Sequence, residues 1–212
     1  MVNELKKRDC DIHISLLPSG TQFLCVKMDI QGDHLHFLPS SAVGGQFGDF
    51  ISALYNLFYE GDDGHDEWTG RHYISDENHM ILASQVTVEW DEEHDMAHIV
   101  MTRKWSNEID FESDVMDIEF KRYDKLIKKY TVKTVDFCYA VAKACTEALK
   151  KYGFYGYRYS TEQDYFQLHQ FLYIKSLALM NFEARELVLE CQDEYAKCSS
   201  FEKEMELLLF DM

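Results

Sequence analysis

The chain has 212 residues, of which 46% are hydrophobic and 28% charged, and its formal net charge is −17 at pH 7. The apolar fraction is large enough for a sizeable core, which excludes a disordered chain, and the negative charge disfavours binding to nucleic acid or to anionic membranes. No run of about 18 apolar residues is present, so no membrane-spanning helix is expected. At this length we expect a single domain over residues 1–212.

The N-terminal segment and the cysteines indicate the cellular compartment. The segment reads MVNELKKRDCD and has no apolar stretch after its basic residues, so we expect no secretory signal and a cytoplasmic protein with reduced thiols. Cys138 and Cys145 are seven residues apart, as are Cys191 and Cys198. On a helix this spacing separates the sulfur atoms by about 10 Å, too far for a disulfide. We interpret these cysteines as small core residues, with a catalytic thiol as the alternative.

Two short strands and one helix are predicted in the first 60 residues. Residues 1–20 are expected to be irregular. A strand over 21–30 and a return strand over 34–38 are separated by a turn at Gln31-Gly32-Asp33. A helix is predicted over 47–59, because its apolar residues recur on one face of a 3.6-residue period. Those residues are Phe50, Ile51, Leu54, Leu57 and Phe58.

Period-two alternation follows over the next 60 residues. It predicts strands near 67–74, 80–90, 96–105 and 113–121. In the second of these, Val86, Val88 and Trp90 alternate with Gln85, Thr87 and Glu89. Such alternation indicates an antiparallel sheet with one buried face and one solvated face.

The chain is predicted to be helical from about residue 131. A helix over 135–151 places Cys138, Ala142, Cys145 and Leu149 on one face. A capping box at Ser160 predicts a very apolar helix over 161–180. Asn181 is expected to cap another helix that extends to Cys198, and a capping box at Ser199 opens a short last one.

The order of these elements predicts an α+β fold. We expect an antiparallel sheet of about four to six strands, packed by one helix between strands and by three to four C-terminal helices. The sheet-rich part is expected over about 21–121 and the helical part over about 131–212. The apolar helices of 161–210 are a candidate surface for a homo-oligomer.

The acidic charge is concentrated in one segment. Residues 60–119 contain 18 Asp or Glu and three basic residues, which gives −15, whereas the rest of the chain sums to −2. A local field of this sign attracts basic proteins. Because the segment coincides with the period-two pattern, we expect the acids to coat the solvated sheet face and its turns. The candidate contact residues are Trp68, Trp90, Asp91, Glu92, Glu93, Asp95, Asp117 and Glu119.

Histidines offer an alternative, a metal-dependent enzyme. His34 and His36 are two residues apart on a predicted strand and so share a face, and His94 and His98 lie among the acids. These four with nearby Asp or Glu side chains are the candidate ligands. No known metal, nucleophile-elbow or phosphate-loop motif is present, which favours a protein that is not an enzyme and needs no cofactor.

Two stretches resemble a loose group of bacterial immunity-type proteins, the cytosolic partners of polymorphic toxins. The first is FGDFISALYNLFYEG, residues 47–61, followed by Asp66-Glu67-Trp68 and a strand pair. The second is DYFQLHQFLYIKSL, residues 164–177. The proline that is typical near the tryptophan of that group is absent here. The resemblance implies an inhibitor that binds a toxin, and it carries over no catalytic residue. We therefore expect an acidic protein-binding module with a basic protein partner, of which a nuclease toxin is one example.

Overall fold

The structure is a computed structural model that describes residues 8–18, 24–39, 46–58, 70–76, 79–91, 96–105, 113–123, 125–161, 166–179, 188–190, 197–199, 201–210 and 212. Within these ranges the elements follow one another as strands, a helix, more strands and then mostly helices. The expected α+β class is confirmed. The expectation of one sheet is wrong, because the described strands form a three-stranded sheet, a five-stranded sheet and a two-stranded ladder.

The first sheet is built from β1 (Ile12–Pro18), β2 (Leu24–Ile30) and β3 (Asp33–Phe37), paired antiparallel in that order. β2 and β3 match the predicted strands, but β1 lies in the stretch that is expected from sequence to be irregular. It forms because Ile12, Ile14 and Leu16 alternate with polar residues and are all buried. The β2–β3 turn places Gln31 and Gly32 at φ 52° and 84°, the left-handed conformation that a tight two-residue hairpin turn requires.

The second sheet contains β4 (Gly70–Asp76), β5 (His79–Asp91), β6 (Met96–Trp105), β7 (Val115–Arg122) and β8 (Lys125–Lys133), in sequential antiparallel order. The first four of these confirm the predicted strands to within a few residues. β8 falls where no strand is predicted, between the sheet-rich part and the helical part. Only Tyr130 and Val132 of this strand are buried, and four of its nine residues are lysines. Exposed lysines are typical of an edge strand.

The hairpin turn of the first sheet packs on this edge strand. The side chain of Gln31 donates from Nε2 to the backbone oxygen of Thr131 at 3.0 Å. Asp33 accepts hydrogen bonds from Lys128 Nζ and from the Tyr130 hydroxyl, both at 2.9 Å to Oδ2. Burial and then the bond to this carboxylate raise the pKa of Tyr130 to about 12. These contacts join the two sheets and give β8 a partner on its outer edge.

The helices are α1 (Gln46–Asn56), α2 (Thr134–Thr161), α3 (Leu168–Ala178) and α4 (Phe201–Leu209). α1 confirms the predicted amphipathic helix, and the predicted face of α2 is buried at Cys138, Ala142 and Cys145. α2 extends past its predicted end, with a kink at Gly153, where φ is 67°.

Two helix predictions in the C-terminal part are wrong. The capping box at Ser160 does not open a helix, because Ser160 lies in the last turn of α2 and α3 begins only at Leu168. The helix expected after Asn181 is replaced, where the structure describes that stretch, by the strands β9 (Val188–Glu190) and β10 (Lys197–Ser199), which pair antiparallel. The short last helix is confirmed as α4.

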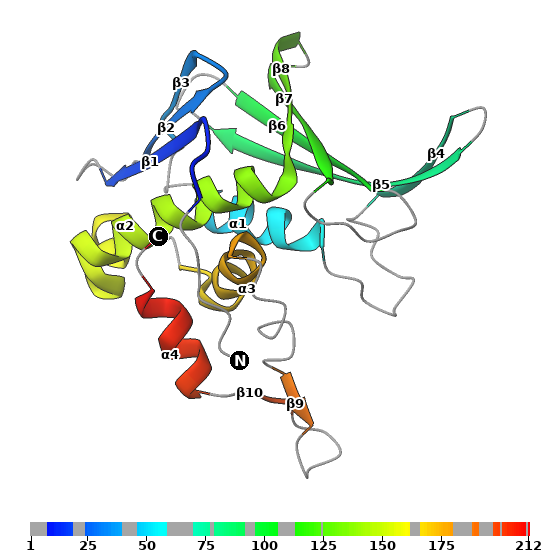
Figure 1. The fold of residues 1–212 in the computed structure, drawn as a ribbon. Coiled ribbons are helices and arrows are strands. Elements are labelled where there is room, and N and C mark those ends of the chain that lie inside the picture. The colour runs from blue at the N-terminus through cyan, green and yellow to red at the C-terminus, as the bar shows by residue number, and fades with distance from the viewer. Residues whose placement is uncertain are drawn as a thin grey trace.

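Figure 1 shows β1–β3 and β5–β8 on one side of the molecule and the helices on the other. One hydrophobic cluster joins the inner faces of both sheets to all four helices, with Trp90, Phe50, Phe137 and Phe171 among its largest fully buried side chains. The outer faces of both sheets are left uncovered by helices (Figure 1). Among the described helices, none is both long and apolar enough to cross a bilayer.

Candidate functional site

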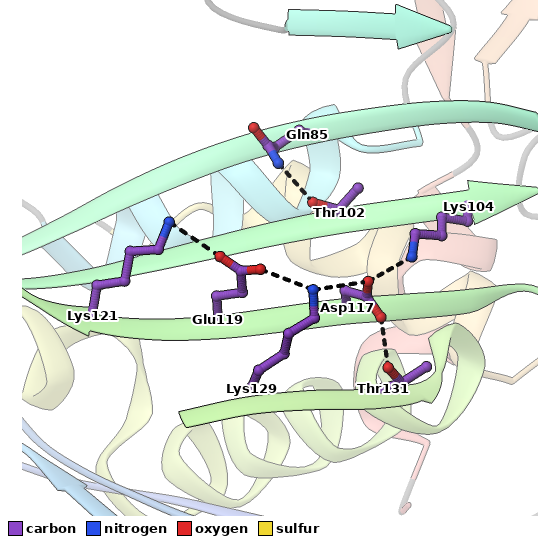
Figure 2. A network of polar contacts seen from close by, with 8 residues as sticks. All are labelled: Gln85, Thr102, Lys104, Asp117, Glu119, Lys121, Lys129 and Thr131. Carbon is purple, nitrogen blue, oxygen red and sulfur yellow. Dashed lines mark hydrogen bonds and ion pairs between the residues drawn. The ribbon is translucent and has the colours of Figure 1, made fainter. Parts of the chain in front are cut away.

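The outer face of the strands β5–β8 carries two of the predicted contact residues, Asp117 and Glu119. Antiparallel register aligns Gln85, Thr102, Asp117 and Thr131 in one row across the four strands. The Gln85 Nε2 donates to Thr102 Oγ1 at 2.9 Å, and Thr131 Oγ1 donates to Asp117 Oδ1 at 2.6 Å. Figure 2 shows this row and the lysines around it. A continuous row of polar side chains therefore crosses the face.

Asp117 is the centre of the network. Its carboxylate is nearly buried, with 6% of the residue exposed, and its Oδ2 lies 2.6 Å from Lys104 Nζ and 3.4 Å from Lys129 Nζ (Figure 2). Burial alone would raise the pKa of this carboxyl, but the hydrogen bonds from Lys104 and Thr131 and the two lysine charges outweigh it and lower the pKa. Asp117 is therefore held as a carboxylate by its own neighbours.

Glu119 occupies the adjacent row on the same face. Its Oε1 accepts a hydrogen bond from Lys129 Nζ at 2.9 Å, and its Oε2 lies 3.1 Å from Lys121 Nζ (Figure 2). The hydrogen bond from Lys129 is the main cause that lowers the pKa of Glu119, and Lys121 adds to it. Lys129 thus bridges Asp117 and Glu119, which makes the two acidic side chains parts of one ion-pair network.

Glu89 is the most accessible carboxylate among the described side chains of this face. Its side chain is 64% exposed, and its Oε1 lies 3.8 Å from His98 Nδ1 on the next strand. Thr87 beside it is also exposed. Met96 and Val115, at opposite ends of the face, each expose 37% of their surface. The face therefore offers an exposed acid, exposed polar groups and two apolar side chains.

The charge of the described face does not match the expectation. Its described side chains include three acids, Glu89, Asp117 and Glu119, and four bases, Lys104, Lys121, Lys129 and Lys133. The three acids lie on the sheet face as expected, but lysines of β6, β7 and β8 compensate Asp117 and Glu119, so the described face is not net acidic. Twelve of the 18 acids in 60–119 belong to the connecting segments outside the described residues.

The structure separates the predicted contact residues. Trp90 has no exposed surface and packs in the core, with its ring centroid 5.4 Å from that of Phe37 and 5.5 Å from that of Phe50. Its predicted role as a surface contact is therefore wrong. Asp117 is an internal anchor, and Glu119 is partly accessible. Asp91 is described only as the last backbone position of β5, paired with Met96. Outside the described residues lie Trp68, Glu92, Glu93 and Asp95.

The predicted metal ligands do not converge in the described part of the chain. His34 and His36 share the outer face of β3, as expected, but His34 pairs with Asp29 and His36 with Cys25. The hydrogen bond to the Asp29 carboxylate is the main cause that raises the pKa of His34. His98 belongs to the other sheet, and His94 lies outside the described residues. No group of three metal-ligating side chains forms within the described ranges.

Sequence reasoning missed the lysines and the threonine that organise the face, because it missed β8. When residues 125–133 form a strand, its alternation places Lys129 and Thr131 on one face, opposite Glu119 and Asp117 in the antiparallel register. The same alternation on β2 and β3 brings Cys25 and His36 together, a pair that sequence separation alone does not reveal.

Comparisons with protein-family models, with curated proteins and with solved structures found no match to the chain.

Proposed function

We propose that the chain is a non-enzymatic protein-binding module for a basic protein partner, which docks on the outer face of β5–β8 and is attracted by the acidic segments that connect those strands. The observation that carries this proposal is where the acidic side chains lie and which of them have a basic neighbour. The acids of this segment whose side chains are described, Glu89, Asp114, Asp117 and Glu119, each lie beside a basic side chain. By sequence, the connecting segments within residues 60–119 hold twelve of the 18 acids and no lysine or arginine.

A negative charge of this size acts before contact. At an ionic strength of 0.15 M the screening length is about 8 Å, so acids spread over several strand connections attract a cationic surface as it approaches. Such steering raises the association rate more than it lowers the dissociation rate. The expected partner therefore presents a basic surface, and its binding weakens with salt.

The uncovered face supplies the contact surface. Exposed Met96 and Val115 provide apolar area at its two ends, and Glu89 and Thr87 provide hydrogen-bonding groups between them. The network around Asp117 holds the surrounding lysines in fixed positions, which lowers the entropy lost on binding. A preorganised sheet face with apolar ends suits a folded partner better than a small molecule.

The resemblance of residues 47–61 and 164–177 to immunity-type proteins suggests a class of partner. A toxin that cleaves nucleic acid carries a basic active surface, which is the complement of the acidic segments proposed here. Binding there would block access of the nucleic acid. Co-expression with a toxin encoded beside this chain tests this class, since growth is restored only if the chain neutralises the toxin.

The contact face is tested by charge reversal. Glu89→Lys places a positive charge on the exposed face, and Glu147→Lys is the matched control, because Glu147 is exposed on α2, on the helical side of the molecule. In affinity capture from the native cell at low ionic strength, Glu89→Lys should recover at least about fivefold less partner, and Glu147→Lys should recover as much as the unaltered chain. Equal losses in both variants would show general charge attraction without a docking face.

A further inference from the structure

The outer face of the first sheet holds a thiol and an imidazole in direct contact. Cys25 Sγ lies 3.0 Å from His36 Nε2, across the pairing of β2 with β3. Cys25 is half-buried and His36 is exposed, so both are accessible from solvent on the side away from the helices. A nucleophile and a base within hydrogen-bond reach are the geometric requirement for an activated thiol.

Two leucines and one lysine surround the pair of Cys25 and His36. Leu17 on β1 is the register partner of Cys25, and Leu38 follows the end of β3 on the opposite side. Both leucines are exposed, at 37% and 40%. Lys27 is the register partner of His36, and it adds a positive charge on the same face. The thiol therefore lies between two apolar side chains, with a base and a cation beside it.

We propose that Cys25 is a thiol–disulfide exchange site, at which His36 accepts the thiol proton and small disulfides that carry carboxylates are the reactants. The Cys25 thiol gives its proton to His36 Nε2, and the sulfur attacks one sulfur of the disulfide. The S–S bond of the reagent breaks, a mixed disulfide forms at Cys25, and the leaving thiolate takes the proton from His36. One thiol and one disulfide are consumed, and one mixed disulfide and one thiol are produced.

Lys27 gives the site its preference among disulfides. Its ammonium group lies on the face that an approaching reagent must cross, so carboxylate-bearing disulfides are attracted and ammonium-bearing ones are repelled. Asp29 and His34 pair with each other one row further along this face, where His13 of β1 is the register partner of Asp29. The nearest uncompensated charge to Cys25 on the described face is therefore positive.

Two other described cysteines, Cys10 and Cys138, provide internal controls. Cys10 is half-buried, its thiol donates to the backbone oxygen of Ile12 at 3.4 Å, and burial is the main cause that raises its pKa. Cys138 is fully buried, and burial raises its pKa to about 12. Cys10 thus serves as the accessible thiol without an imidazole, and Cys138 as the thiol that reacts only when the protein unfolds.

The test is peptide-resolved mass spectrometry of the intact chain after brief exposure to the dianionic disulfide DTNB. An ordinary thiol is about 3% ionised at pH 7, so activation can raise the rate by up to about 30-fold. Cys25 is expected to react at least about tenfold faster than Cys10. His36→Asn should slow Cys25 about fivefold or more at pH 7, with recovery at alkaline pH, and leave Cys10 unchanged.

His34→Asn is the matched control, since it removes a histidine of the same strand that contacts Asp29 instead. Cys138 should remain unlabelled in each variant, which verifies that the fold is retained. In Lys27→Gln, the ratio of the Cys25 rate with DTNB to its rate with cationic cystamine should fall. The slowing of Cys25 by His36→Asn should be unchanged in the Lys27→Gln background. The proposal is overturned if Cys25 reacts no faster than Cys10, or if His36→Asn and His34→Asn have the same effect.

Discussion

Arg103 and Asp114 form an ion pair that is almost completely buried, with Arg103 Nη2 2.6 Å and Nε 3.0 Å from Asp114 Oδ2. The guanidinium also donates from Nη1 to the backbone oxygen of Leu57 at 3.5 Å, and it lies 4.9 Å from the centroid of the Phe58 ring. The pair therefore connects β6 and the residue before β7 to Leu57 and Phe58, which directly follow α1. It fixes the sheet against the helical layer at the inner side of the candidate face.

Removing one member of this pair should destabilise the protein strongly. Arg103→Met leaves the Asp114 carboxylate buried without its partner, and Asp114→Asn does the same to the guanidinium, so each is expected to lower the free energy of unfolding by about 3–5 kcal/mol. The combined variant should lose less than the sum of the two, because neither charge is then left buried alone. Urea denaturation of the four proteins measures this cycle, and strictly additive losses would refute the coupling.

Acid should weaken the ion-pair network of the outer face. The pKa values of Asp117 and Glu119 are lowered in the folded protein from ordinary values of 3.8 and 4.5. The unfolded chain therefore binds protons more readily, so the stabilisation is complete above about pH 5 and is lost as the pH falls through the lowered values. Asp117→Asn should lower stability at neutral pH by roughly 1–3 kcal/mol and flatten the decline in acid.

Thr131→Val is the matched control for this pH dependence. It removes one hydrogen bond to Asp117 but keeps the acid and its two lysines. Stability at neutral pH should fall, and the slope of stability against pH below about 5 should decrease by less than in Asp117→Asn, because the two lysines still lower the pKa of Asp117. The assignment would be wrong if Asp117→Asn kept the full acid slope in urea denaturation measured across this pH range.

Lys175 should anchor the last helix. Its residue is fully buried, and its Nζ donates to the backbone oxygens of Phe210 at 2.8 Å and of Leu208 at 3.3 Å, at the end of α4. A cation at a helix C-terminus satisfies carbonyls that lack intrahelical partners. Lys175→Met is expected to cost about 2 kcal/mol and to speed hydrogen exchange in α4. Lys133→Met, at an exposed position of β8, should change stability by less than about 0.5 kcal/mol.

The strands and helices that could be predicted from the sequence are those in which burial follows a clear period. The alternation of β5 places Val86, Val88 and Trp90 on its apolar side, and all three are buried. That alternation already opposes a surface role for Trp90, and the structure agrees with the pattern. β8 could not be predicted because Leu126 and Ile127 are exposed and only two inner residues are buried, which leaves little periodicity to detect.

The charge balance of the candidate face could not be predicted without the register. Glu119 and Lys129 are ten residues apart in the chain and become neighbours only because β7 and β8 form a hairpin. A bulge between Phe120 and Lys121 shifts the pairing further along the same hairpin. Composition locates an acidic segment, but the pairing of individual charges depends on strand alignment, which composition does not contain.

The most direct test of the binding proposal is the salt dependence of partner capture. The unaltered chain is immobilised and exposed to extract of the native cell at about 0.02 M and at about 0.5 M salt, at which the screening lengths are roughly 20 Å and 4 Å. The proposal predicts a specific basic protein that is retained at low salt, released at high salt and recovered at least about fivefold less with Glu89→Lys. Capture of no protein at low salt, or of a partner whose retention is independent of salt, would contradict it.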